Sequence, residues 1–248
     1  MFWKILNLVA AILYLLAGGY IIFRFKDKLP YKVTTILMTL LIFIPQVATL
    51  IRTYSMDISC IDPTWENLMA VLPTANISPF MFSMVFVVLF LPKTIQKHFY
   101  LLMALLSFAM IVAGIGSPVR WAFFNYYHQF ILIEWVTHLT MALFGIYLLL
   151  TKRIELTVRN CLKASIIIYA IVAIMIVLNI IFGTAFFGLA FNGEHNFYNQ
   201  IFITDPYLSA FVYIIGLTFF LVTGYFFLKL IKRIDEKRAV VVDEEQTT

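Results

Sequence analysis

The stretch "FILIEWVTHLTMALFGIYLLLTKR" (residues 130–153) decides the fold, because it places a long apolar run directly before two basic residues. A helix of roughly 20 mostly apolar residues crosses the hydrocarbon core of a bilayer, and residues 130–150 meet that requirement. Lys152 and Arg153 follow at once, as basic residues do on the cytoplasmic side of a membrane helix. Since similar runs recur along the chain, the sequence predicts an all-α, polytopic membrane protein.

The composition agrees with a membrane protein and excludes an ordinary soluble domain. The chain has 248 residues, of which 62% are hydrophobic and 12% charged, and its mean hydropathy is +0.94. Soluble domains carry about 25% charged residues. Two cysteines are too few for a disulfide framework. We expect one transmembrane domain over residues 1–230 and a short charged cytoplasmic tail, disordered, over residues 231–248.

Seven apolar runs reach or approach the length of a membrane span, and prolines punctuate the connections between them. The first run is longer than the core of a typical signal peptide and has no A-x-A cleavage site after it, so we interpret it as an uncleaved anchor. The predicted spans are residues 3–23, 33–53, 78–92, 99–116, 130–150, 164–187 and 207–228. The sequence therefore predicts a seven-transmembrane-helix bundle.

The basic residues set the direction of the spans, since cytoplasmic connections are rich in Lys and Arg. Of the 18 basic residues, all but three fall in the first, third and fifth connections and after the last span. The three exceptions are Lys4, Arg52 and Arg120. This alternation predicts a multi-pass protein of the cell membrane with its N-terminus outside and its C-terminus inside. It also explains the net charge of +5 without a nucleic-acid partner. Cys60 and Cys161 fall on opposite sides, so we expect no disulfide between them.

The polar side chains within the spans share one depth, in the outer half of the membrane. Glu134 and His138 are four residues apart, so they project from one face of their helix. An ionisable side chain inside a membrane is costly and is by default a functional candidate. We therefore predict an outward-facing polar pocket centred on His138. The further members predicted for this pocket are Gln46, Asn76, His128 and Asn179.

Each of these residues also has a structural interpretation, which the sequence leaves open. Glu134 and His138 can neutralise one another as a private pair. Gln46 and Asn179 can serve as hydrogen bonds between helices, and His128 can be solvated at the interface. The adjacent Glu194 and His195, before the last span, are too small a donor set for a metal site. We expect no metal and no cofactor.

Three stretches resemble the YwaF-like family of bacterial integral membrane proteins: "LPTANIS" (72–78), "FFNYYHQFILIEWVTH" (123–138) and "NIIFGTAFFGLAF" (179–191). Animal relatives of that family look like intramembrane lipid acyltransferases in which a cysteine and a histidine are implicated. The resemblance implies a role for His138, and extends to His128. The chain departs from the family pattern at the start of span three. The family has Leu-Pro followed by a His and a Cys there, whereas this chain has Thr74, Ala75 and Asn76 and no cysteine nearby.

The first functional hypothesis is an enzyme that transfers or hydrolyses an acyl group of a lipid in the outer leaflet. His138 is the general base, Glu134 orients it, and the hydroxyl of Thr74 or Ser78 is the nucleophile. The candidates for donating a hydrogen bond to the oxyanion are Asn76 and Asn179. The resemblance favours this hypothesis.

The second hypothesis is non-catalytic and is favoured by the missing cysteine. The protein is then a small-molecule or proton-coupled transporter, or a membrane accessory or binding protein. Glu134 and His138 would carry a proton or contact a substrate. Membrane lipid is a partner under both hypotheses, and the sequence specifies neither the substrate nor an oligomeric state.

Overall fold

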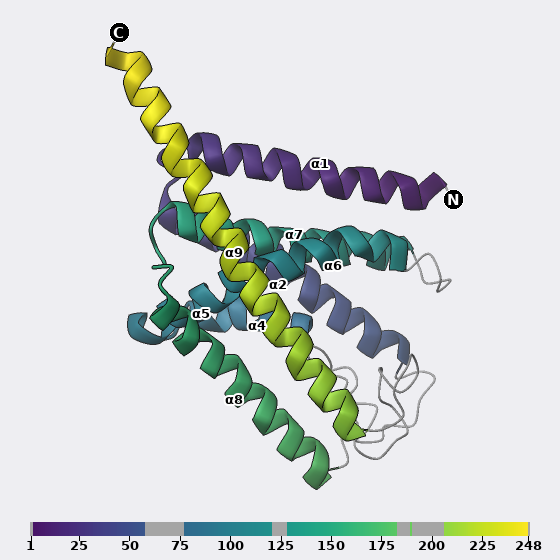
Figure 1. Cartoon of the computed structure of the whole chain (residues 1–248). Helices are drawn as coiled ribbons and strands as arrows, with labels where there is room; N and C mark the ends of the chain where they lie inside the picture. Colours follow the sequence, from purple (N-terminus) through teal and green to yellow (C-terminus); the bar gives the residue numbers. More distant parts are fainter. Residues whose placement is uncertain (1, 58–76, 121–127, 183–188, 190–205, 248) are drawn as a thin grey trace.

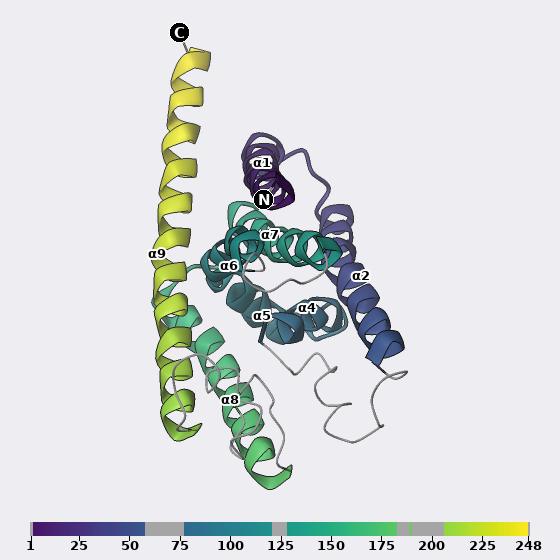
Figure 2. The same ribbon diagram turned by 90° about the vertical axis from the view of Figure 1, so that its right-hand side faces the viewer.

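The computed structural model describes residues 2–57, 77–120, 128–182, 189 and 206–247, and over these residues it has eight helices and no strand. The predicted all-α fold is confirmed. The helices are α1 (Phe2–Phe25), α2 (Tyr31–Asp57), α4 (Ile77–Val88), α5 (Lys93–Leu105), α6 (Ser107–Arg120), α7 (His128–Leu150), α8 (Val158–Phe182) and α9 (Pro206–Thr247). Helices α5 and α6 form one bent passage (Figure 1). The helix axes differ widely in direction, since α1 is seen end-on in Figure 2, where α9 runs along the length of the picture.

Four helices are long and apolar enough to cross a membrane: Ile5–Phe25, Tyr31–Ala48, Val158–Phe182 and Tyr207–Arg238. The pair α5 and α6 makes a fifth if it counts as one span, although its two axes differ by 44°. The α4 helix has 12 residues, and the apolar part of α7, Glu134–Leu150, is shorter than the four long helices. Among the described residues, four or five of the seven predicted spans therefore have the length and composition of a membrane helix.

The predicted continuous span over residues 99–116 is broken in the structure at Leu106. The break lies where α7 approaches α5 closely, because a Cβ added to Gly145 would come within 2.7 Å of the Ala104 Cα. The Ser107 hydroxyl donates at 3.4 Å to a carbonyl oxygen of the preceding turn, and such back-bonding often bends a helix. Neither proline nor glycine marks this position in the sequence.

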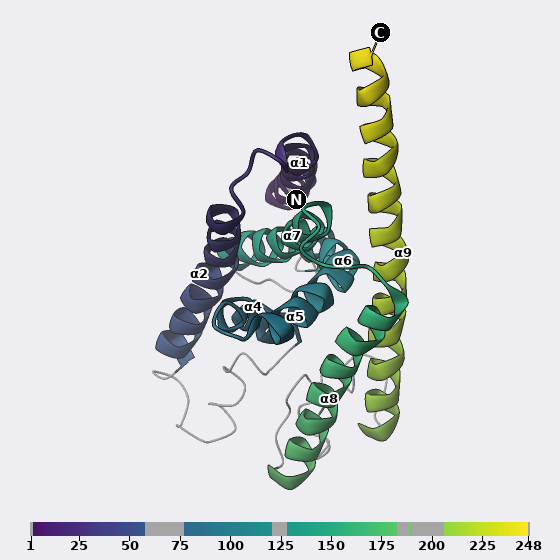
Figure 3. The same cartoon turned by 90° about the vertical axis from the view of Figure 1, so that its left-hand side faces the viewer.

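Helix α7 lies at the centre of the molecule, where all its side chains from Thr137 to Leu150 are buried. Figures 2 and 3, seen from opposite sides, show α1, α2, α5 and α6 around it, and these helices make its most extensive contacts. A helix that is apolar on all sides must be enclosed by protein or lipid. For α7 the surroundings are other helices.

Basic connections meet at one end of the molecule, which we call the basic end. The Arg153 guanidinium, just after α7, stacks over the ring of Tyr31 at the start of α2, 3.9 Å from its centroid. Lys97 of α5 and Lys152 line one hollow there. The basic end is thus where α1 and α7 finish and where α2, α5 and α8 begin.

Helix α9 extends far beyond the length of a span. Its 42 residues correspond to roughly 63 Å, and Figure 1 shows it passing the end of α1. Lys26, after α1, forms an ion pair with Asp235, and Arg238 donates to the Phe23 carbonyl oxygen at 3.4 Å. The tail 231–248, for which we expected disorder, is instead helical as far as Thr247.

Candidate functional site

His138 is buried on α7, with 5% of its surface exposed. Its Nδ1 atom lies 2.7 Å from the main-chain oxygen of Glu134, one turn earlier. Because a carbonyl oxygen only accepts, Nδ1 carries the proton and Nε2 holds the lone pair of the neutral ring. The ring stands perpendicular to that of Phe82 of α4, with 4.9 Å between centroids. The imidazole is thus held in one orientation, with Nε2 as its basic atom.

Glu134 supports this orientation through its backbone. We predicted that the Glu134 side chain orients His138, whereas the group bonded to Nδ1 is the main-chain oxygen of Glu134. The carboxyl group belongs to a half-buried residue on the same helix. A side-chain substitution leaves this main-chain oxygen in place. The role predicted for the Glu134 carboxylate stays a prediction.

Helix α2 presents a polar face to the interior and an apolar face to the surroundings. Thr35, Thr39, Ile42 and Gln46 are all buried, and their spacing places them within about 60° of one another on the helix. The exposed residues on the rest of the helix include Val33, Ile36, Leu37, Leu40, Leu41 and Ile44. This is the opposite of a soluble amphipathic helix, and it means that polar groups line the contact of α2 with α7 and α4.

Two hydroxyls on this face have no hydrogen-bond partner among the described residues. They belong to Thr35 and Thr39, and the hydroxyl of Tyr147 on α7 is a third. Threonines within membrane helices commonly donate to the carbonyl oxygen four residues earlier. Those that do so here are Thr34, Thr140, Thr151, Thr218 and Thr223. Thr35 and Thr39 differ from this group.

Gln46 stands at the level of His138. Phe43 of α2 stacks on Phe86 of α4, with 4.4 Å between ring centroids. One turn further from the basic end, α2 carries Gln46 and α4 carries Phe82, against which His138 packs. Gln46 and His138 thus lie on neighbouring helices, while the pocket that they were predicted to share stays a prediction.

Asn179 lies at a different helix contact. It is buried on α8, where its amide donates at 2.7 Å to the Leu189 carbonyl oxygen. Helix α8 packs mainly against α5, whereas His138 packs against α4 and α6. The hydrogen bond of Asn179 joins α8 to the segment that follows it, and does not place Asn179 beside Gln46 and His138.

Several predicted site residues lie outside the part of the chain that the structure describes. Thr74 and Asn76 precede α4, and the cation candidates Glu194 and His195 precede α9. Ser78 is in α4 and His128 begins α7, but the structure describes neither side chain. The nucleophile and the four-helix pocket stay predictions.

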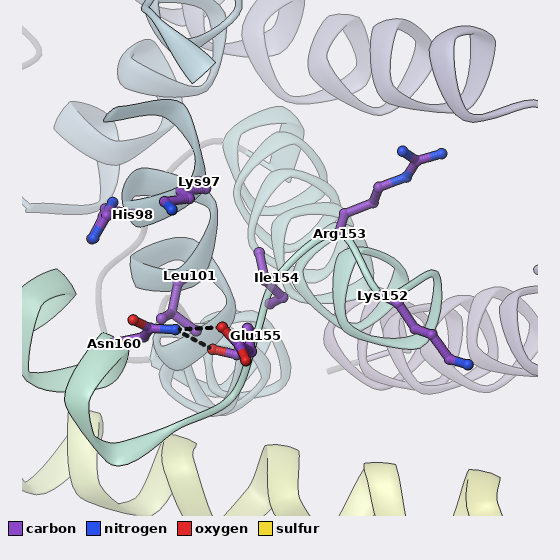
Figure 4. Close-up of a pocket in the computed structure, with 8 residues that line it drawn as sticks. All are labelled: Lys97, His98, Leu101, Lys152, Arg153, Ile154, Glu155 and Asn160. Carbon is purple, nitrogen blue, oxygen red and sulfur yellow. Dashed lines mark hydrogen bonds between the residues drawn. The ribbon is translucent and has the colours of Figure 1, made fainter. Parts of the chain in front are cut away.

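A hollow at the basic end is lined by α5, by the connection from α7 to α8 and by the start of α8 (Figure 4). Its lining residues are Lys97, His98, Leu101, Lys152, Arg153, Ile154, Glu155 and Asn160. Figure 4 shows the side chains of Lys97 and Lys152 pointing in different directions, while Asn160 donates to the Glu155 carboxylate at 3.0 Å. Strong anion binding uses converging charged donors. These diverge, so the hollow does not have the geometry of an anion site.

Within the described residues, no group of three or more His, Cys, Asp or Glu side chains could hold a metal ion. Comparison with protein-family models, with curated proteins and with solved structures found no match to this chain.

Proposed function

We propose that the chain is a seven-span protein of the cell membrane, with its N-terminus outside and its C-terminus inside. The support is the gathering of basic connections at one end. Lys26 pairs with α9, Lys97 shares a hollow with Lys152, and Arg153 stacks on the start of α2. By the distribution of Lys and Arg in membrane proteins, the basic end faces the cytoplasm. The passages through α4 and α7 complete the seven crossings.

The proposed function is proton-coupled transport of a small molecule, with His138 as the proton-carrying group. The observation that carries it is the fixed imidazole. Its Nδ1 is satisfied by a backbone oxygen, so protonation and release take place at Nε2. Histidine is the side chain whose ordinary pKa lies nearest neutral pH, so it binds and releases a proton under physiological conditions. His138 lies about 12 Å from the outer end of the predicted span 130–150, at 1.5 Å per residue. Its proton would therefore be bound and released within the membrane.

Acyl transfer or hydrolysis on a lipid of the outer leaflet is the second candidate. The same tautomer favours it, because a general base must present a lone pair to the nucleophile while its other nitrogen is held. Thr74 or Ser78 would supply the hydroxyl, and Asn76 would donate to the oxyanion. The resemblance to the YwaF-like family points the same way.

The proton-carrying role is tested by histidine NMR on the full chain in lipid. The chain has four histidines, and His138→Gln identifies the ring nitrogens of His138 by the loss of their signals. We expect those signals to titrate reversibly at Nε2 while the protein stays folded. An imidazole that keeps one protonation state from about pH 5 to 9, on both sides of the ordinary histidine pKa, would refute the role.

The two candidates are separated by a lipid assay. Vesicles of phosphatidylcholine and phosphatidylethanolamine with labelled acyl chains are incubated with the protein and analysed by mass spectrometry. Released or transferred acyl chains that disappear in His138→Gln and in either Thr74→Ala or Ser78→Ala favour the enzyme. Their absence, together with a titrating His138, favours the transporter.

A further inference from the structure

The buried face of α2 carries polar groups from the basic end to the level of His138. It begins one turn beyond Tyr31, over whose ring Arg153 stacks. It continues through Thr35 and Thr39, and Gln46 follows at the level of His138. Thr35 and Gln46 are about 16 Å apart along the helix axis. The face therefore covers the inner half of the membrane, in which we had predicted no functional group.

A dry contact between α2 and α7 would not explain this face. Both threonine hydroxyls are enclosed, and neither has a protein partner among the described residues. A buried hydroxyl without a partner is unfavourable in an apolar medium, and such groups in natural proteins are normally hydrogen-bonded. Thr34, next to Thr35 on the same helix, satisfies its hydroxyl at the Pro30 carbonyl oxygen. Backbone bonding is thus available to threonines of α2, yet Thr35 and Thr39 do not use it.

We propose that the buried polar face of α2 carries a file of water molecules from the cytoplasmic side to His138, and that protons reach His138 along it. The inference rests on the proposed role of His138 as a proton carrier. Water fits a polar site with several partners, and the hydroxyls of Thr35 and Thr39, one turn apart on α2, are the unpartnered groups of this face. Ile42, fully buried, is the apolar member of the face and lies between Thr39 and Gln46.

The proton balance of this path is simple. A hydronium ion at the basic end gives one proton to the file. Each water or hydroxyl then accepts one proton and releases another, so the path itself is unchanged. The lone pair of Nε2 takes the last proton, and the ring becomes an imidazolium ion. Release of that proton at the outer side restores the neutral ring with Nδ1 still bonded to the Glu134 oxygen.

The test replaces both hydroxyls by methyl groups of similar size, in Thr35→Val/Thr39→Val. Proton flux is measured with a pH-sensitive dye inside vesicles that hold the full chain, under an imposed membrane potential. We expect the flux to fall by about tenfold, which corresponds to about 1.4 kcal/mol of barrier. The melting temperature in detergent should stay the same or fall, because the valines remove hydrogen bonds to water. Thr34→Val is the matched control for the flux and should leave it unchanged, although its melting temperature falls slightly because the hydrogen bond to the Pro30 carbonyl oxygen is lost.

Opposite results would overturn the water file. In a dry contact the valines remove unpaired hydroxyls, so the melting temperature rises and the flux does not change. Wild-type vesicles that conduct no more than empty ones would overturn it as well. Thr39→Val alone is measured if the double variant does not fold. A titrating His138 with unchanged flux in the valine variant rejects the path alone, whereas a His138 that does not titrate rejects the proposed function.

Discussion

Helices α1 and α7 are both long and apolar, yet their surroundings differ completely. In α7 the side chains from Thr137 to Leu150 are buried. In α1 the described side chains are mostly exposed or half-buried, and those of Ala11 and Ile22 are the buried ones. An exposed Leu16 in a membrane protein faces lipid, which is as apolar as leucine itself.

The difference teaches that apolar content does not distinguish the buried interior of this protein from its exposed surface. Small and polar residues separate them. The α7 helix carries His138 and Gly145 at contacts with other helices, and α1 meets α7 through Gly18 and through the Tyr14 hydroxyl, 2.7 Å from that of Thr140. Since apolar burial does not drive helices together in lipid, close approach and hydrogen bonds carry the specificity.

The largest expected effect is in cysteine labelling, which tests on which side of the membrane each connection lies. The comparison assumes that α1 and α7 both run toward the cytoplasm, and it fails if they do not. An impermeant thiol reagent added outside intact cells should label Cys60 fully and a cysteine at residue 237, on the exposed part of α9, not at all. The native Cys161 is a poor reporter because it is buried and would stay unlabelled in either orientation.

The variant for this labelling is therefore Cys161→Ala with Lys237→Cys, compared with Cys161→Ala alone. Permeabilised cells provide the control, since residue 237 should then react. Labelling of residue 237 before permeabilisation would reverse the proposed topology.

The next largest effect is expected from replacing one glycine on each of the two helices by alanine and comparing the changes in stability. Gly145→Ala should destabilise by about 2–3 kcal/mol, the cost of overpacking against a backbone that cannot move aside. Its new Cβ would meet the Ser107 hydroxyl and lie 2.7 Å from the Ala104 Cα. Gly19→Ala on α1 has nothing within 4 Å and should stabilise by up to about 1 kcal/mol, because alanine favours the helix. Thermal unfolding in detergent measures both, and equal shifts would show that α7 is not the tightly packed helix.

The apolar runs sufficed to predict the helices and their approximate positions. A helix that crosses a bilayer needs a long apolar segment, regardless of how it packs against other helices. They did not predict the break at Leu106, which depends on how closely Gly145 of α7 approaches α5. Nor did they predict the helix after residue 231. There Asp235 meets Lys26 and Arg238 caps the end of α1, and these are contacts between residues more than 200 positions apart.

For the candidate site, the sequence predicted His138 and Gln46, because a polar group in an apolar run is visible without a structure, and the structure shows both side chains buried. It could not show that Nδ1 bonds to a backbone oxygen rather than to a carboxylate, because that depends on a rotamer. It also missed the face formed by Thr35 and Thr39. The signal was present in the spacing of residues 35, 39, 42 and 46, but threonines in a helix usually satisfy themselves.

The ion pair between α1 and α9 is expected to have an intermediate effect. Asp235→Asn removes the charge that pairs with Lys26. The Lys26 side chain is 17% exposed and the Asp235 side chain 20% exposed. We expect a loss of about 1–2 kcal/mol, typical of a partly enclosed hydrogen bond to a charged group. Glu236→Gln is the matched control, because its pair with Lys232 is more than half exposed at 3.8 Å and should contribute less than about 0.5 kcal/mol. If the two variants have the same melting temperature, the ion pair with α9 does not stabilise the end of α1.

The smallest effect concerns how the two helices end. After α7, the amides of Lys152 and Arg153 donate to the carbonyl oxygens of Leu149 and Leu148, and Lys152 adopts a positive φ of 56°. This arrangement is the Schellman motif, in which glycine is the favoured residue because a side chain is strained in the left-handed region. Lys152→Gly should therefore stabilise by about 0.5–1 kcal/mol, the relief of strain less the greater entropy of glycine in the unfolded chain.

The turn after α1 provides the contrast. Among the described non-glycine residues, positive φ is recorded at Lys152 and not at Asp27. Asp27→Gly should therefore destabilise by about 0.5–1 kcal/mol, since glycine there adds freedom to the unfolded chain and relieves nothing. Thermal unfolding of the two variants under one set of conditions should give shifts of opposite sign. Two shifts of the same sign would mean that the end of α7 is not closed by a strained residue, and that α1 and α7 end in the same way.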